Sequence, residues 1–174
     1  MRTERLGIEP LVPAHAAETF GPLGDESLYR FIPQDPPQAL DALIARYGRL
    51  ASRRSPDGTE AWLNRVMRDR VSTEIVGTLE ATVTPDHVAA IAYVVVVPHQ
   101  RRGYAAEGVA GMIDHLVSAL RVTRLRADVD TRNAASIALQ RRLRFTRIAF
   151  TRDADHFKSA TSDEYRYERV LLPN

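Results

Sequence analysis

Hydrophobic residues recur with a helical period in the first third of the chain. A short alternating strand is predicted over residues 6–11, followed by helical segments over residues 14–20 and 25–31. Apolar residues three or four positions apart then predict a longer helix over residues 38–52. One face of this helix carries Leu40, Leu43, Ile44, Tyr47 and Leu50.

The period changes to that of strands at residue 61. Strands are predicted over residues 61–69, 74–83 and 87–97, and the last is apolar on both faces, which is typical of a central strand. A helix over residues 103–120 follows. Its apolar stripe consists of Val109, Met112, Ile113, Leu116, Val117 and Leu120.

The C-terminal part predicts a strand, a helix and two more strands, over residues 125–130, 134–143, 145–151 and 165–171. Residues 153–162 are polar and are predicted to form a loop. The whole order indicates one α/β domain over residues 1–174, with neither repeats nor a linker.

Composition agrees with an ordinary globular protein, at 44% hydrophobic and 26% charged residues. The absence of cysteine excludes disulfides, thiolate metal sites and a cysteine nucleophile. The five histidines lack metal-ligand spacing, so no metal is expected. No apolar stretch has membrane-spanning length and the N-terminus lacks the core of a signal peptide, so we expect a cytoplasmic protein without a membrane partner.

Positive charge is concentrated in one part of the chain. Residues 98–152 hold 11 arginines and four acidic residues, whereas residues 1–60 hold seven arginines and nine acidic residues. A basic region suits a ligand with several phosphates. Nucleic acid is the less favoured candidate, because no aromatic stacking motif accompanies the arginines.

The basic region begins with a strand that turns sharply into a helix. Four valines, Val94–Val97, precede the loop Pro98-His99-Gln100-Arg101-Arg102-Gly103-Tyr104-Ala105-Ala106. Backbone N–H groups at a helix start lack intrahelical partners and bind anions, and Gly103 permits close approach. An ordinary strand-to-helix turn with two solvated arginines is the alternative interpretation.

The spacing Gln-Arg-Arg-Gly-Tyr-Ala after Val-Val-Val-Pro resembles the acyl-CoA pyrophosphate loop of the GCN5-related N-acetyltransferase (GNAT) superfamily. The element order and the stretch Asn133-Ala134-Ala135-Ser136-Ile137 extend the resemblance along nearly the whole chain. It is closest to the group that includes ribosomal-protein N-terminal acetyltransferases. The resemblance implies a mixed sheet of roughly seven strands, with a splayed central parallel pair and helices on both faces, and acetyl-CoA as co-substrate.

The resemblance also implies which residues bind the donor. They are Val95, Val96, Val97, Gln100, Arg101, Arg102, Gly103, Tyr104, Ala105, Ala106, Asn133 and Ser136. The N–H groups of residues 102–106 would hold the diphosphate, and an N–H near Val95 or Val96 would polarise the thioester carbonyl. Asn133 is equally suited to be a helix N-cap, which needs no ligand.

Two positions depart from the family pattern. Gln140 stands where many members have a tyrosine that protonates the leaving thiolate, and Arg144 stands where many have glycine. Ser136 is therefore the candidate acid, with solvent as the alternative. Candidates for the base are Glu80, Asp128, Asp130 and Glu164, of which we favour Glu80; an exposed carboxylate or an arginine partner is the alternative role for each.

These features predict an acetyl-CoA-dependent N-acetyltransferase. The acceptor would be a primary amine, of a protein N-terminus or of a small molecule, that attacks directly in a ternary complex. Gln140 motivates a different hypothesis, a non-catalytic acyl-CoA-binding module, and the basic region a third, an RNA- or ribosome-binding protein. The resemblance also admits a homodimer.

Overall fold

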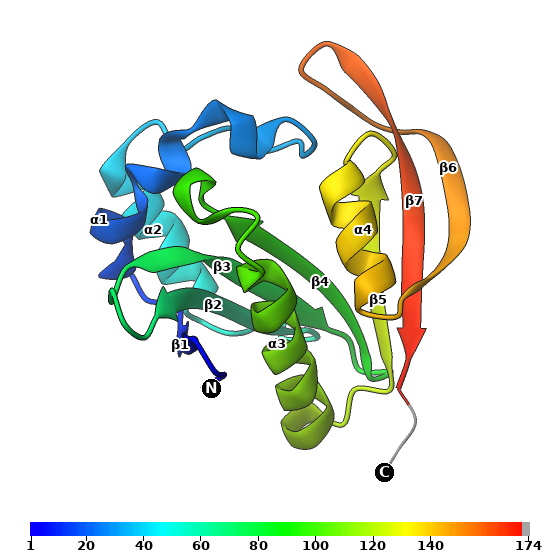
Figure 1. The fold of residues 1–174 in the computed structure, drawn as a ribbon, viewed down its shortest axis with the longest axis horizontal. Helices are drawn as coiled ribbons and strands as arrows, with labels where there is room; N and C mark the ends of the chain where they lie inside the picture. Colours follow the sequence, from blue (N-terminus) through cyan, green and yellow to red (C-terminus); the bar gives the residue numbers. More distant parts are fainter. Residues whose placement is uncertain (172–174) are drawn as a thin grey trace.

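The computed structural model describes residues 1–171, in which seven strands form one mixed sheet in the order β1-β2-β3-β4-β5-β7-β6 (Figure 1). The strands are β1 (Leu6–Pro10), β2 (Ala61–Asp69), β3 (Ile75–Val83), β4 (Val88–Val95), β5 (Arg124–Asp130), β6 (Thr146–Phe157) and β7 (Ala160–Val170). The α-helices are α1 (His15–Thr19), α2 (Leu40–Leu50), α3 (Tyr104–Leu120) and α4 (Ala134–Arg142). Short 3₁₀ turns cover Pro22–Gly24, Glu26–Tyr29 and Val97–His99.

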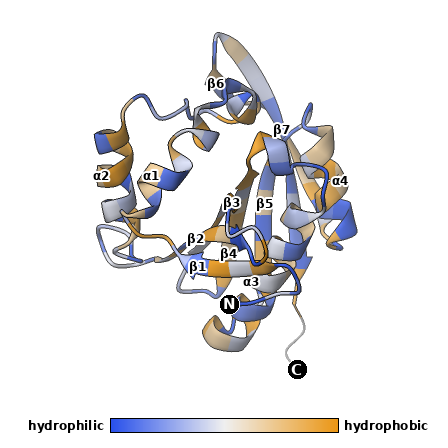
Figure 2. Cartoon of the chain, turned by 60° about the vertical axis from the view of Figure 1, so that its left-hand side comes forward, coloured by the Kyte–Doolittle hydropathy of each residue, from blue (hydrophilic) through white to orange (hydrophobic). Residues whose placement is uncertain are grey.

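Helices cover both faces of the sheet. On one face, α3 packs in the larger core, which includes Leu79, Met112 and Leu125. On the other face, α1 and α2 pack in a smaller core around Val66 and Tyr47. Figure 2 shows the most hydrophobic stretches gathered on the central strands, between these layers. The predicted α/β architecture is confirmed.

Close packing of α3 on the sheet depends on a small residue at the contact. A Cβ atom on Gly108 would overlap the Sδ atom of Met67 on β2. Gly108 therefore sets how near the helix lies to the sheet, and with it the position of the loop at the start of the helix.

The central parallel pair separates along its length, as the resemblance implied. β4 and β5 pair at three positions, from Val88 with Arg124 to Ala90 with Arg126. Beyond Ala90 the strands diverge, and Figure 1 shows the gap widening toward their C-terminal ends. On its other edge β4 stays paired with β3 as far as Val95.

The prediction of a loop over residues 153–162 is wrong. β6 and β7 continue through this stretch as a hairpin, in which Asp155 pairs with Ser162. The chain reverses at Lys158 and Ser159, which both have positive φ, at 52° and 59°. Polar residues can form strands here because both faces of the hairpin are largely exposed and no apolar face has to be buried. Cross-strand hydrogen bonds therefore hold the hairpin despite its polar composition.

β4 ends two residues earlier than predicted. Val97–His99 forms a 3₁₀ turn that contains Pro98, and proline has no N–H to donate to a ladder. Within residues 1–171, no helix is long and apolar enough to cross a membrane.

Candidate active site

The gap between β4 and β5 leaves an unpaired strand edge in the middle of the sheet. Tyr93, Val94 and Val95 are only half-buried although they lie on a central strand. Central parallel strands are normally buried on both faces and paired on both edges. The open edge therefore offers hydrogen-bonding groups to an extended ligand, in the way that an added strand pairs with a sheet.

The hydrogen-bond pattern decides which residues of β4 face the gap. The Val96 N–H donates to the Val76 oxygen at 3.0 Å, on the β3 side. Because alternate residues of an antiparallel strand point to the partner, the N–H groups of Val95 and Tyr93 point toward the gap. This corrects the expectation for Val96, whose N–H is already used; Val95 carries the available N–H.

The loop after β4 is braced from two sides. The Gln100 side chain donates to the Val95 oxygen at 3.0 Å, which ties the loop to the strand. Arg5 donates to the Arg102 oxygen at 2.9 Å and pairs with Glu107 at 2.7 Å. The hydrogen bond and charge of the Glu107 side chain raise the pKa of Arg5 further above its ordinary value.

The braced loop exposes a row of backbone N–H groups. Gly103 is the N-cap of α3 with φ of 84°, a left-handed conformation that glycine adopts without strain. Within the described chain, the N–H groups of residues 101–106 have no hydrogen-bond partner, whereas Glu107 N–H already donates to the Gly103 oxygen. The side chains of Arg101 and Arg102 are exposed beside them. This is the arrangement that binds diphosphate at a helix N-terminus.

Tyr104 contributes its backbone to this row, but its side chain has another role. Its hydroxyl donates to Asp69 Oδ2 at 2.5 Å. This bond, with the N–H groups of Ser72 and Val71, lowers the pKa of Asp69 to about 2. The contact fixes the first turn of α3 to the end of β2, and the sequence pattern did not indicate it.

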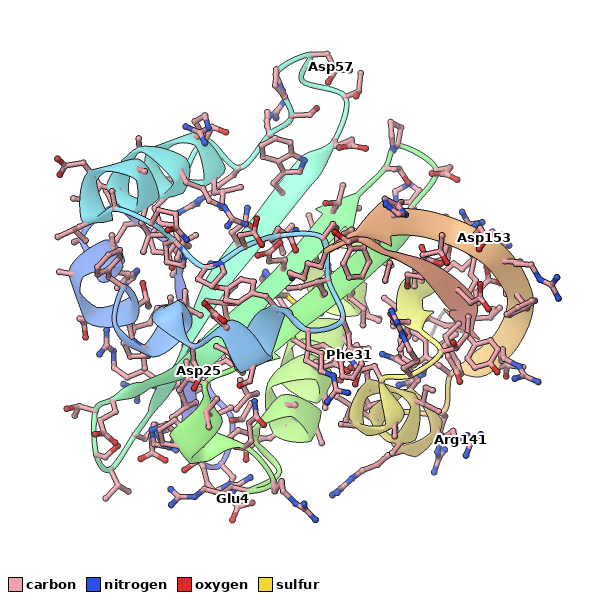
Figure 3. All side chains as sticks on the ribbon, turned by 90° about the horizontal axis from the view of Figure 1, so that it is seen from above. Glu4, Asp25, Phe31, Asp57, Arg141 and Asp153 are labelled. Atoms are coloured by element: carbon pink, nitrogen blue, oxygen red, sulfur yellow. The ribbon has the colours of Figure 1, made fainter. Side chains whose placement is uncertain are left out.

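The opposite wall of the gap is α4. Asn133 is its N-cap, and its Oδ1 accepts from Ser136 N–H at 3.0 Å. The capping role of Asn133 is therefore confirmed, and its donor-binding role stays a prediction. Of the basic run that follows, Arg141 lies on the outer side of α4, away from the gap (Figure 3).

A cavity of about 120 Å³ lies on the α2 side of the sheet. Its floor includes Glu80 on β3 and Ala92, its direct partner on β4, and its walls include Arg46 and Tyr47 of α2. Glu80 makes no ion pair or side-chain hydrogen bond with any residue of 1–171. Glu80 is thus a free carboxylate that lines a cavity next to β4.

The other candidate bases have different surroundings. Asp128 pairs with Arg166 at 2.7 Å. Burial alone would raise the pKa of Asp130, but bonds from Arg132 and Ser162 outweigh it and lower that pKa. Both carboxylates therefore have structural partners. Glu164 has a raised pKa because of its burial and the nearby Asp128.

No group of three or more potential metal ligands occurs among the described residues. The arrangement instead combines an anion-binding loop, an open strand edge and a carboxylate in a cavity. Together these features can hold an extended diphosphate ligand and take a proton from a group entering from the other face.

Known proteins share the fold of this chain. The family model for the acetyltransferase (GNAT) domain matches residues 5–146. Among solved structures, the ribosomal L7/L12 alpha-N-protein acetyltransferase RimL, in complex with coenzyme A, has a TM-score of 0.86 at 17% identity, covering 99% of this chain and 97% of that one. Spermidine N-acetyltransferase from Vibrio cholerae, in complex with CoA and spermine, has a TM-score of 0.84 at 14% identity, covering 98% of both chains.

A third structure, a probable acetyltransferase (GNAT family) from Chromobacterium violaceum, has a TM-score of 0.80 at 26% identity, covering 97% of this chain and 84% of that one. No curated protein sequence matched. The structural likenesses at 17% and 14% identity show the shared fold, and the family model adds the sequence evidence over most of the chain. The chain belongs to the GNAT acetyltransferase family.

Proposed function

We propose that this protein is an acetyl-CoA-dependent N-acetyltransferase that acts on a primary amine, of a peptide N-terminus or of a small molecule. The observation that carries the proposal is the open edge of β4 at Val95, directly followed by the row of unpartnered N–H groups over residues 101–106. One extended ligand with a diphosphate at one end satisfies both.

The donor half of the site fits acetyl-CoA. The loop N–H groups and the positive end of α3 would hold the diphosphate, with Arg101 and Arg102 adding charge. The pantetheine arm would pair with the edge of β4. Acetyl-CoA supplies an activated thioester, and the Val95 N–H donates a hydrogen bond to its carbonyl oxygen, where negative charge develops.

The acceptor half lies on the other face of the sheet. An amine in the cavity beside Glu80 is close to the strand that holds the donor. Glu80 accepts the proton that the amine loses, directly or through one water molecule. A peptide N-terminus, whose ordinary pKa is roughly 8, already has a substantial neutral fraction near neutral pH.

Titration calorimetry with acetyl-CoA and CoA tests the donor site. We expect the wild type to bind both and the Arg102→Glu, Gly103→Asp variant to lose at least about tenfold in affinity, because a charge is inverted and the left-handed turn is strained. Arg141→Glu is the control, with a charge inversion on the outer side of α4. Absence of binding to the folded wild type would overturn the proposal.

Thiol release against a panel of N-terminal peptides and small amines then tests catalysis. Mass spectrometry of the acceptor identifies the acetylated nitrogen. Release with one class of amine supports the proposal and names its substrate. Tight donor binding without release on any amine would favour the non-catalytic module, the hypothesis that Gln140 motivates.

A further inference from the structure

Two buried polar atoms without hydrogen-bond partners lie at the gap between β4 and α4. They are the hydroxyl of Tyr93 and the Oε1 atom of Gln140. Gln140 is 1% exposed. Buried polar groups are almost always hydrogen-bonded, and leaving one unpaired destabilises the folded protein. Two such atoms close together indicate groups whose hydrogen-bond partner is supplied by a bound ligand.

The positions of the two residues place them at the reacting end of the donor. Tyr93 precedes Val95 by two residues on β4, so both lie on the same face and the same open edge of the strand. Gln140 follows Ser136 by one helical turn, so these two share a face of α4. The side chains of Ser136 and Gln140 are the polar groups near the Tyr93 hydroxyl, although neither makes a hydrogen bond with it in the free protein.

We propose that Tyr93 is a catalytic residue that donates the proton to the departing sulfur. This inference rests on the proposed function. Gln140 occupies the family's usual tyrosine position, and an amide cannot serve as an acid. The missing hydroxyl is instead supplied across the gap, from β4.

The proton must be replaced as it leaves. Burial raises the pKa of Tyr93, only partly offset by Ser136 and Gln140, so a phenolate is disfavoured here. The Ser136 hydroxyl lies beside Tyr93 on the half-buried first turn of α4. Ser136 therefore passes a proton to the Tyr93 oxygen and regains one from solvent.

Atoms and electrons balance in this step. The amine nitrogen forms a bond to the acetyl carbon, and the carbon–sulfur bond breaks with its electron pair going to sulfur. The Tyr93 proton moves to sulfur, the Ser136 proton moves to Tyr93, and a water proton moves to Ser136. The proton lost by the amine goes to Glu80 and then to solvent, so the products are an amide and a thiol.

The test compares Tyr93→Phe, Ser136→Ala and the double variant by steady-state kinetics. We expect Tyr93→Phe to lower kcat by roughly tenfold to a hundredfold, at or below the lower limit usual for general acid catalysis, because a thiolate is already a fair leaving group. The KM for acetyl-CoA should change little. Because both residues act on one proton path, the double variant should lose much less than the product of the two single losses.

Tyr167→Phe is the matched control, the same substitution at a buried core tyrosine on β7. It should leave kcat unchanged. Wild-type kcat in Tyr93→Phe would overturn the inference, as would a parallel loss of CoA affinity and thermal stability, which indicates a structural role. A wild type that releases no thiol would overturn the proposed function itself, so the two failures differ.

Discussion

Backbone groups make up most of the site that we propose for the donor. The N–H groups of residues 101–106 and of Val95 need a particular chain conformation, and side chains such as Gln100 and Arg5 hold that conformation in place. At the scale of single residues, function therefore depends on positions whose own side chains do no chemistry. Gly103 is such a position, whereas Glu80 would act through its side chain.

Gly103→Ala should weaken CoA binding and destabilise the protein by about 1–2 kcal/mol, because φ is 84° and the new Cβ would lie 3.3 Å from Arg5 Nη2. Gly48→Ala is the control. It lies within α2 with nothing within 4 Å of the new Cβ, and should stabilise by roughly 0.5–1 kcal/mol. Urea unfolding and calorimetry measure both. Equal effects at the two glycines would contradict the argument.

Glu80→Gln should lower kcat at least about tenfold near pH 7 without changing CoA affinity, because the cavity loses its free carboxylate. The deficit should shrink as pH rises and more of the amine is neutral. Glu60→Gln, outside the cavity lining, should keep wild-type kcat. A Glu80→Gln enzyme with the wild-type pH–rate profile would remove Glu80 from the mechanism.

Glu164 should make stability depend on pH. Burial and Asp128 raise its folded-state pKa, so its contribution to stability is present below the ordinary pKa of glutamate and is lost as pH rises through the raised value. Glu164→Gln removes this loss. The variant should therefore gain in unfolding free energy relative to wild type as pH rises above the ordinary pKa of glutamate, about 4.3, as urea unfolding would show. A pH-independent difference would speak against this assignment.

At the scale of elements, the β6–β7 hairpin holds one wall of the cavity that we propose for the acceptor. Lys158 at its turn donates to the carbonyl oxygens of Tyr29, Ile32 and Gln34, and Tyr29 and Gln34 line the cavity. Figure 3 shows the loop that carries Phe31 crossing the sheet toward this hairpin. A segment from the C-terminal part thus holds the wall formed by the N-terminal part.

Lys158→Met should raise the KM for the amine several-fold and leave CoA affinity unchanged, because the cavity wall loses three hydrogen bonds far from the donor loop. Arg152→Met, which removes an exposed charge from the same hairpin, is the control. Steady-state kinetics with each substrate varied gives the comparison. An unchanged amine KM would show that the Lys158 hydrogen bonds do not shape the cavity.

At the scale of the molecule, the sheet consists of two groups of strands that are paired over only a short length. Strands β1 to β4 and strands β5, β7 and β6 are joined within the sheet by three residue pairs between β4 and β5. A ligand in the gap contacts both sides, so binding should stabilise the whole fold.

Acetyl-CoA at about 100 times its Kd should raise the unfolding free energy by about 2.7 kcal/mol. Hydrogen exchange should slow at Val95 and over residues 101–106, whose N–H groups lack partners in the free protein. The Arg102→Glu, Gly103→Asp variant should show a smaller stabilisation and weaker protection at the same ligand concentration, because its Kd is higher. Protection confined to other segments would place the ligand elsewhere.

Local pattern was enough to predict most elements. The prediction for residues 61–69 matches β2, and that for residues 103–120 differs from α3 by one residue. Periodicity, proline and helix-start signals are encoded within a few residues, which is why the loop around Gly103 was also recognisable. The continuation of the β6–β7 hairpin through residues 153–162 was not recognisable, because these polar residues are held by cross-strand pairing and not by a hydrophobic pattern of their own.

The sequence by itself determined the family, the element order and the sharp turn from β4 into α3, since each depends on neighbouring residues. Only the tertiary structure decided that Val95, and not Val96, faces the gap, because this depends on the register between β3 and β4. It also decided that Tyr93 meets Ser136 and Gln140, residues far from it in the sequence, since such contacts arise from how strands and helices pack.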